Sequence, residues 1–202
     1  SIGNDYDNKL TISPQSGHFT TDESWVYDGK MHKPNMTVDA PYDDSKYTIT
    51  YRKQGTETDL TEITDAGVYD IIITFPNGNY IADETSSKTI TVTPKTVNFT
   101  VTDNVVDYDG NEHTAKVTPT EALASDLYSV KYVKRDTETK LNSVTNAGVY
   151  DIVIELANSN YTLDGSFSAT MTVNVTYTFN LGNSPAAMIY KDTTHDAEWQ
   201  KE

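Results

Sequence analysis

"Asp65-Ala66-Gly67-Val68-Tyr69" is the stretch that most strongly indicates the fold, because it leads directly into an alternating segment. Apolar side chains recur at every second position from Tyr69 through Ile71 and Ile73 to Phe75. Such alternation predicts a β-strand over residues 67–75 with one face buried and the other in contact with solvent.

The same stretch occurs a second time, as Asn146-Ala147-Gly148-Val149-Tyr150, at an offset of 81 residues. From Tyr27 to Val92 this offset holds without a gap and gives 28 identities in 66 positions. A fixed period of this length is typical of tandem modules, each one a supersecondary unit. The sequence therefore predicts two copies of one module.

The corner before the alternating strand resembles the start of strand F in immunoglobulin-like domains, where a tyrosine hydroxyl bonds back to the backbone. Tyr69 and Tyr150 occupy the tyrosine position of that corner. We expect about seven short strands per module, which in the first copy are residues 19–21, 24–27, 31–38, 47–51, 58–63, 67–75 and 88–93. This pattern predicts an all-β chain of tandem immunoglobulin-like β-sandwich modules, with β-grasp-like modules as the alternative.

The repeat also sets the expected domain boundaries. Leu10-Thr11-Ile12-Ser13-Pro14 resembles Ile90-Thr91-Val92-Thr93-Pro94, so residues 1–14 are interpreted as the end of a preceding repeat. Residues 15–94 and 95–175 are the two complete repeats. Tyr190 and His195 lie 82 residues after Tyr108 and His113, which suggests that residues 176–202 begin a truncated third repeat.

Composition restricts the partners and the chemistry. The 202 residues carry a formal charge of -15, which disfavours nucleic acid and anionic lipid as partners. No cysteine is present, which removes disulfides and thiolate chemistry, and no apolar run is long enough for membrane insertion. We expect no cofactor, and we interpret the chain as a piece of a longer extracellular protein.

The second repeated motif is a Tyr-Asp-Gly turn followed by a histidine, formed by Tyr27, Asp28, Gly29 and His32 and again by Tyr108, Asp109, Gly110 and His113. A type I′ hairpin around Asp28-Gly29 would place Trp25 opposite His32 on a half-buried face, with the histidine held by a hydrogen bond. No nucleophile motif accompanies either copy. We interpret the motif as structural, and we expect no catalytic residue in the chain.

Other candidate sites have weaker support. Asn4-Asp5-Tyr6-Asp7-Asn8 and Tyr42-Asp43-Asp44-Ser45 contain oxygen ligands of the kind that calcium accepts, but neither has the spacing of a calcium-binding loop. The four histidines are too far apart to suggest zinc, and nothing singles out a carboxylate pair for glycoside hydrolysis. Tyr80 and Tyr161, which follow Asn-x-Asn loops, are the best candidates for ligand contact, although packing onto the sandwich edge is the favoured reading.

The whole pattern resembles the YDG/MBG-type repeats of bacterial cell-surface proteins, from the Tyr-Asp-Gly-x-x-His start through Ala-Gly-Val-Tyr-Asp-Ile to Asn-x-Asn-Tyr. Lys191-Asp192-Thr193 departs from this pattern after Tyr190, where Asp-Gly would follow. The resemblance implies a non-enzymatic stalk, spacer or adhesion module on the cell surface or in a secreted protein. Its expected partners are neighbouring repeats of the same chain. The open alternatives are a module that binds glycan or a host or matrix protein, and an accessory region of a larger secreted enzyme.

Overall fold

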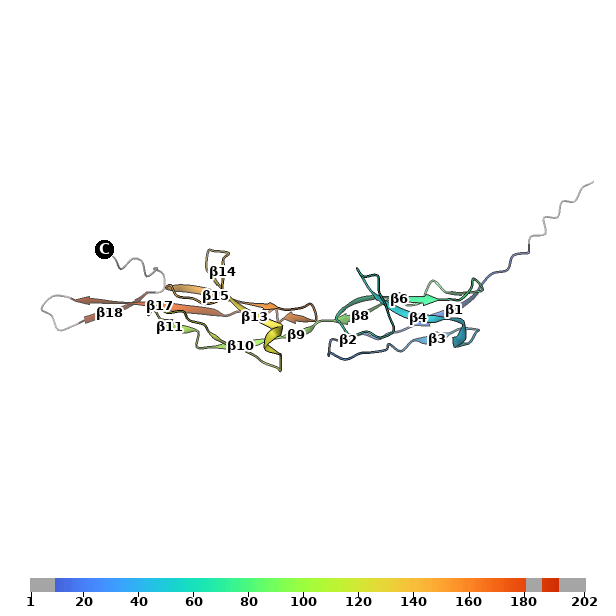
Figure 1. Cartoon of the computed structure of the whole chain (residues 1–202), viewed down its shortest axis with the longest axis horizontal. Coiled ribbons are helices and arrows are strands. Elements are labelled where there is room, and N and C mark those ends of the chain that lie inside the picture. Colours follow the sequence, from blue (N-terminus) through green and yellow to red (C-terminus); the bar gives the residue numbers. More distant parts are fainter. Residues whose placement is uncertain (1–9, 181–186, 193–202) are drawn as a thin grey trace, which may run out of the picture. The chain divides into compact units, whose positions relative to one another are not determined.

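The computed structural model describes residues 10–180 and 187–192, and it describes the side chains of residues 10–177. Between Pro94 and Lys95 the chain divides into two compact units, each built almost entirely of short strands (Figure 1). The expected all-β fold class is confirmed. Each unit is described below on its own.

In the first unit, two sheets enclose one core. Its strands are β1 (Gln15–Thr20), β2 (Trp25–Val26), β3 (Thr37–Asp39), β4 (Thr48–Lys53), β5 (Asp59–Leu60), β6 (Gly67–Thr74), β7 (Tyr80–Ala82) and β8 (Thr89–Thr93). One sheet has the order β3-β1-β7 and the other the order β2-β8-β6-β4-β5. A single turn of 3-10 helix, η1 (Asp44–Lys46), precedes β4.

The second unit repeats this plan. Its strands are β9 (Lys95–Val97), β10 (Phe99–Thr102), β11 (Val105–Asp107), β12 (Lys116–Pro119), β13 (Tyr128–Lys134), β14 (Lys140–Leu141), β15 (Gly148–Leu156), β16 (Tyr161–Leu163) and β17 (Thr170–Asn180). The larger sheet has the order β11-β17-β15-β13-β14, while β10 pairs β12 and β9 pairs β16. The 3-10 turn η2 (Ser125–Leu127) stands where η1 stands in the first unit.

The core of each unit is built from the alternating strand and its neighbours. Tyr69 and Tyr150 are 1% and 2% exposed. The buried residues around Tyr150 come from all three sheets of the second unit, whereas those around Tyr69 come mainly from the larger sheet of the first unit. In β15 the alternation is regular, since Tyr150, Ile152 and Ile154 are buried and Asp151 is exposed. Phe19 of β1 meets Tyr47 and Phe75 edge to face, which joins the two sheets of the first unit.

The segment 31–38 differs from its predicted strand. Only Thr37–Asp39 is a strand here, and it pairs antiparallel with β1. Pro34 lies inside the predicted range and has no N–H for a ladder, which explains why pairing is interrupted there. Strand β7 was not predicted at all, because three residues after a polar loop carry too little periodicity.

The predicted hairpin around Asp28-Gly29 is wrong. Trp25–Val26 pairs parallel with β8, with Trp25 opposite Val92, instead of pairing with residues 31–32. His32 forms an isolated bridge with Ile63. The two sides of the turn therefore bond to different neighbours, and this places β2 at the edge of the larger sheet.

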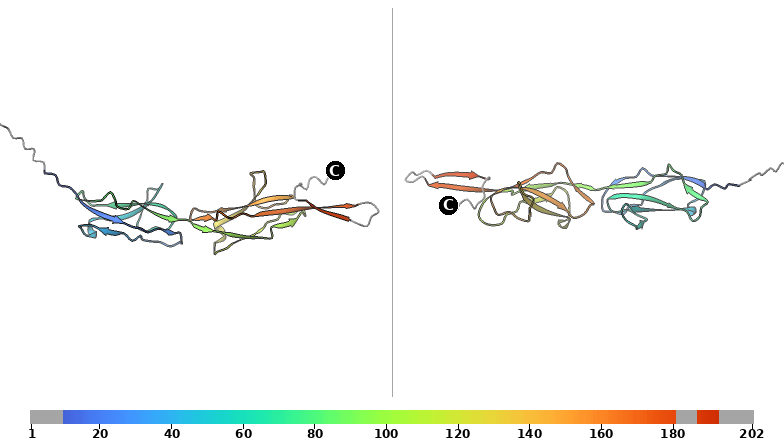
Figure 2. Two further views of the ribbon diagram at one scale, coloured as in Figure 1. Left: turned by 180° about the vertical axis from the view of Figure 1, so that it is seen from behind. Right: turned by 90° about the horizontal axis from the view of Figure 1, so that it is seen from above.

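The β-grasp alternative is not supported, because the described part of the chain contains single 3-10 turns but no α-helix against which a sheet could pack. At the carboxyl end, β17 pairs antiparallel with β18 (Ala187–Asp192), and the two strands form a hairpin (Figure 2). The match between His195 and His113, and most of the segment interpreted as a preceding repeat, lie outside the described residues.

Candidate functional site

Both Tyr-Asp-Gly turns are closed by their own aspartate. The Asp28 carboxylate accepts a hydrogen bond from the Lys30 amide and another from His32 Nε2, both at 2.9 Å. Asp109 accepts from the Asn111 amide at 2.9 Å and from His113 Nε2 at 2.7 Å. An aspartate that bonds the amide two residues ahead forms an Asx turn. Here a histidine four residues ahead closes the turn a second time.

The glycine of each turn has a backbone conformation that suits it. Gly29 has φ 77° and Gly110 has φ 81°, in the left-handed region that other residues rarely adopt. The pKa of Asp28 is lowered, chiefly by the hydrogen bond from His32. Hydrogen bonds from Asn111 and His113 lower the pKa of Asp109 to about 2. Both carboxylates are therefore ionised at neutral pH, which disfavours a role as general acid.

The histidines connect these turns to the core. His32 exchanges backbone hydrogen bonds with Ile63, which is fully buried, and His113 does the same with Val144, which is 1% exposed. The His32 ring lies 4.9 Å from the Trp25 ring, centroid to centroid. This geometry gives the histidines a structural task in both units.

The tyrosine corners have the hydrogen bond that their sequence suggests. The Tyr69 hydroxyl donates to the Asp65 carbonyl at 2.8 Å, and the Tyr150 hydroxyl donates to the Asn146 carbonyl at 2.9 Å. The glycine two residues before each tyrosine has φ 150° in the first unit and 148° in the second. The corner is thus built in the same way twice.

A further polar cluster joins residues that the sequence did not bring together. His18 Nδ1 lies 3.0 Å from both carboxylate oxygens of Asp83 and 3.1 Å from the Thr85 hydroxyl. Ser86 is 4% exposed, and its hydroxyl donates to Asp83 at 3.1 Å while it accepts from the Phe19 amide at 3.0 Å. His18 and Phe19 are 65 or more positions away from the residues that they contact in this cluster, so only the tertiary structure reveals it.

This cluster contains serine, histidine and aspartate but lacks the geometry of a catalytic triad. In a triad the histidine stands between the other two, with one ring nitrogen on the carboxylate and the other on the nucleophile. Here the same nitrogen of His18 faces both Asp83 and Thr85, and the serine bonds Asp83 directly. The cluster ties β1 to the loop after β7.

The two tyrosines expected to contact a ligand lie at equivalent positions and are half-buried. The Tyr80 ring packs on the Tyr42 ring with centroids 4.6 Å apart, and the Tyr42 hydroxyl donates to the Ile81 carbonyl at 3.1 Å. Tyr161 packs against the core of the second unit. Both side chains therefore have a packing role in their own unit.

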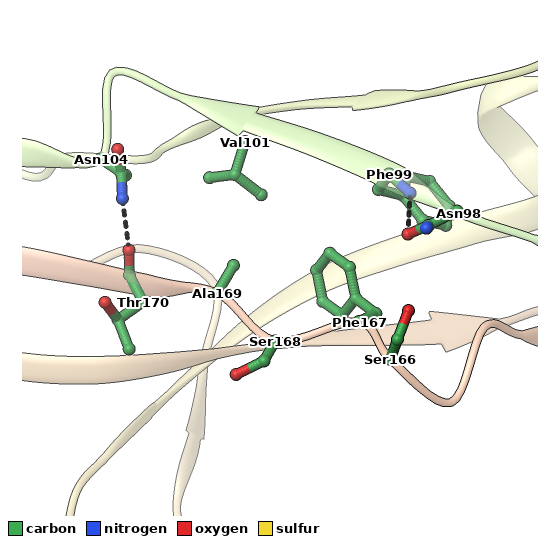
Figure 3. Close-up of a pocket in the computed structure, with 9 residues that line it drawn as sticks. All are labelled: Asn98, Phe99, Val101, Asn104, Ser166, Phe167, Ser168, Ala169 and Thr170. Carbon is green, nitrogen blue, oxygen red and sulfur yellow. Dashed lines mark hydrogen bonds between the residues drawn. The ribbon is translucent and has the colours of Figure 1, made fainter.

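The second unit has a hollow of about 510 Å³ between β10 and residues 166–170 (Figure 3). Val101 points into it from one side, and Phe167 and Ala169 point into it from the other (Figure 3). At one end the Asn104 side-chain amide donates to the Thr170 carbonyl at 2.7 Å. The hollow is thus lined by a few apolar side chains together with polar groups.

In the first unit the equivalent gap is closed by two serines. The Phe19 amide donates to the Ser86 hydroxyl, the Ser87 amide donates to the Phe19 carbonyl at 2.8 Å, and the Thr21 amide donates to the Ser87 hydroxyl at 3.1 Å. The second unit has Phe167 where the repeat places Ser86. A benzyl side chain cannot accept the hydrogen bond that the Ser86 hydroxyl accepts from the Phe19 amide, and the gap stays open.

The backbone of β10 contributes polar groups to the hollow. Phe99 pairs with Pro119, which has no N–H, while the Thr120 amide bonds the Asn98 carbonyl, so the polar groups of Phe99 and Val101 face away from β12. The Phe99 amide bonds the Asn98 side chain at 2.8 Å. Among the described residues the Phe99 carbonyl and the Val101 amide have no hydrogen-bond partner, which leaves one acceptor and one donor facing the hollow.

The proposed calcium ligands near residue 43 are used within the chain. The Asp43 carboxylate accepts from the amide and the hydroxyl of Ser45 and caps η1, while Asn4 to Asn8 lie outside the described residues. Across residues 10–177, no three His, Cys, Asp or Glu side chains are grouped closely enough to hold a metal ion. Within the described part of the chain, no helix has the length and hydropathy needed to cross a bilayer.

A family model described as the MBG domain matches residues 20–96 and again residues 96–177. The chain belongs to the MBG domain family. The two matches together cover most of the chain, and each one contains one Tyr-Asp-Gly turn and one tyrosine corner. MBG domains are a repeat type without enzymatic activity that is typical of extracellular surface proteins. None of the curated proteins compared with the chain matches it significantly.

Proposed function

We propose that this tandem MBG pair is a non-catalytic stalk or spacer segment of a bacterial extracellular surface protein. The observation that carries the proposal is that every polar motif repeated between the two modules is used within its own module. The histidine of each Tyr-Asp-Gly turn bonds its aspartate, and the hydroxyl of each corner tyrosine bonds its backbone. Duplicated parts that serve the fold are what a spacer requires.

The amino-terminal residues support an arrangement of further repeats. Leu10 and Ile12 are 87% and 83% exposed, whereas their counterparts Ile90 and Val92 in β8 are 2% and 1% exposed. Since β8 pairs with both β2 and β6, a strand of this sequence is normally covered on its apolar face. This exposure supports our proposal that residues 10–13 are the last strand of another MBG module.

Single-molecule stretching tests the spacer role. Two modules that carry load independently give two separate unfolding events, each releasing at most roughly 280 Å of chain. Tyr69→Phe should lower the unfolding force of one event and leave the other unchanged. A single event that releases the whole chain, or extension without any force peak, would contradict the proposal. Antibody labelling of intact cells of the source bacterium tests the surface location separately.

Adhesion is the second candidate function, and the hollow of the second module favours it. A hollow with an unpaired backbone carbonyl and an unpaired backbone amide suits a short extended peptide of a host or matrix protein, because one residue of a parallel strand can bond both groups. Phe167→Ser should close the hollow as Ser86 does in the first module. Ser86→Phe is the matched control in the other module.

The measurement for adhesion is binding to immobilised matrix proteins and to a glycan array. Binding that Phe167→Ser removes and Ser86→Phe retains supports the hollow as the contact site. Binding lost only in Tyr80→Ala or Tyr161→Ala favours glycan stacking on the tyrosines instead. No binding to either panel leaves the spacer role. An accessory role in a larger secreted enzyme is distinguished by the domain content of the full-length gene product.

A further inference from the structure

The loop between β6 and β7 contains an unusual pair of residues, Asn77-Gly78, which is the only Asn-Gly pair in the sequence. Residues 76–79 are all exposed. The Asn77 side-chain oxygen accepts a hydrogen bond from the Asn79 amide at 2.9 Å, so the side chain folds over the backbone of Gly78. A Cβ built on Gly78 would have no atom within 4 Å, so the peptide at this position has room to rotate.

In any Asn-Gly pair the backbone nitrogen of the glycine is a nucleophile and the side-chain amide carbon of the asparagine is an electrophile next to it in the chain. We propose that Asn77 is a site of spontaneous deamidation. The Gly78 backbone nitrogen forms a bond to Asn77 Cγ and loses its proton, while the bond from Cγ to the side-chain nitrogen breaks and ammonia leaves. Water then opens the resulting five-membered imide at either carbonyl, which yields aspartate or its β-linked isomer. Glycine favours ring closure because it has no side chain to restrict the attacking nitrogen.

The Asp-Gly turns of the chain share this local sequence but not its reactivity. Asp28, Asp109 and Asp164 each accept hydrogen bonds from a backbone amide two residues ahead and from a nearby side chain. These bonds lower the pKa of all three carboxyl groups, so they remain ionised. An ionised carboxylate is a poor electrophile, whereas the Asn77 amide is neutral at every physiological pH.

The second MBG module contains a matched control. Asn158 accepts from the Asn160 amide at 3.0 Å, which is the same turn, but Ser159 stands in place of glycine. The Cβ of a serine restricts the backbone rotation that ring closure requires. The proposal therefore applies to one module and not to its neighbour.

Deamidation would act on the pairing of β1 with β7. The Gln15 amide bonds the Asn79 carbonyl at 2.9 Å, and Gln15 stands opposite Tyr80 as the first pair of the parallel ladder. A β-linked residue at position 77 adds one methylene to the backbone two residues before that carbonyl. With age, the first module would thus acquire a negative charge, and the first pair of the β1–β7 ladder would be weakened.

Peptide mapping by mass spectrometry tests the proposal on the whole chain, incubated in mildly alkaline buffer. The peptide containing Asn77 should gain about 1 Da several-fold faster than the peptide containing Asn158, because an amide becomes an acid. Gly78→Ala should slow the change at Asn77, and Ser159→Gly should accelerate it at Asn158. Equal rates at the two asparagines would overturn the proposal. So would an unmodified Asn77 in the folded chain when the urea-unfolded chain deamidates there.

Discussion

The Tyr69 hydroxyl donates a hydrogen bond to the carbonyl of Asp65, four residues earlier, at 2.8 Å, while the Tyr69 ring is only 1% exposed. The bond joins the loop that enters β6 to one of the three almost fully buried aromatic side chains of the first unit. Tyr150 and Asn146 repeat the relationship at 2.9 Å. In both MBG modules the start of the central strand is therefore held by a hydrogen bond between residues four positions apart, made by a buried tyrosine.

Removing the Tyr69 hydroxyl should remove this hydrogen bond without creating a cavity. We expect Tyr69→Phe to lower the free energy of unfolding of the first module by about 1 kcal/mol, the usual net value of a hydrogen bond. Chemical denaturation followed by circular dichroism measures it, and Tyr150→Phe should affect the second module equally. Tyr108→Phe is the control, since Tyr108 is 37% exposed. An equal loss in Tyr108→Phe would argue against the corner as the cause.

The corner glycine should resist replacement. A Cβ on Gly67 would lie 2.6 Å from Cε of Lys53, and φ is 150° there. The lysine can move, so backbone strain dominates, and we expect Gly67→Ala to cost about 1–3 kcal/mol. Gly165→Ala is the matched control because its Cβ would meet nothing within 4 Å. Melting temperatures that are the same for both variants would refute the strain.

Loss of the turn histidines should lower stability in both modules. His32→Ala removes the bond to Asp28 and uncovers the Trp25 ring, and His113→Ala removes the bond to Asp109. We expect a lower melting temperature for each variant. In a Trp199→Phe background, His32→Ala should also shift the Trp25 fluorescence to longer wavelength. Unchanged melting in both variants would reopen a functional role for the motif.

Acid should remove the contribution of the His18–Asp83 pair. Hydrogen bonding to His18 lowers the pKa of Asp83 from its ordinary 3.8 to about 2. Because the folded value is the lower one, the stabilisation is complete above about pH 4 and is lost as the pH falls towards 2. Wild-type protein should therefore exceed Asp83→Asn in unfolding free energy at neutral pH, and the two should converge over that range. A constant difference down to pH 2 would contradict this assignment.

Features with a local cause could be predicted from the sequence. Alternation from Tyr69 to Phe75 defined β6 because a strand places every second side chain on one face. The corner was recognisable because its hydrogen bond spans only four residues, and the duplicated motif revealed two modules. The turn at Asp28-Gly29 could be predicted too, although the hairpin that we expected around it was wrong.

The sequence by itself determined the all-β class, the repeat and the buried face of β15, because periodicity depends only on neighbouring residues. In β6 only Tyr69 is buried, and the isoleucines on both faces are half-buried. Only the tertiary structure decided that Trp25 pairs parallel with Val92, that His18 meets Asp83, and that Phe167 leaves open a gap that Ser86 closes. The physical reason is that backbone amides and carbonyls are alike at every position. Packing between segments more than 60 residues apart decides with which strand these groups form hydrogen bonds. Two-residue strands such as β2 are also too short to show a periodic pattern of their own.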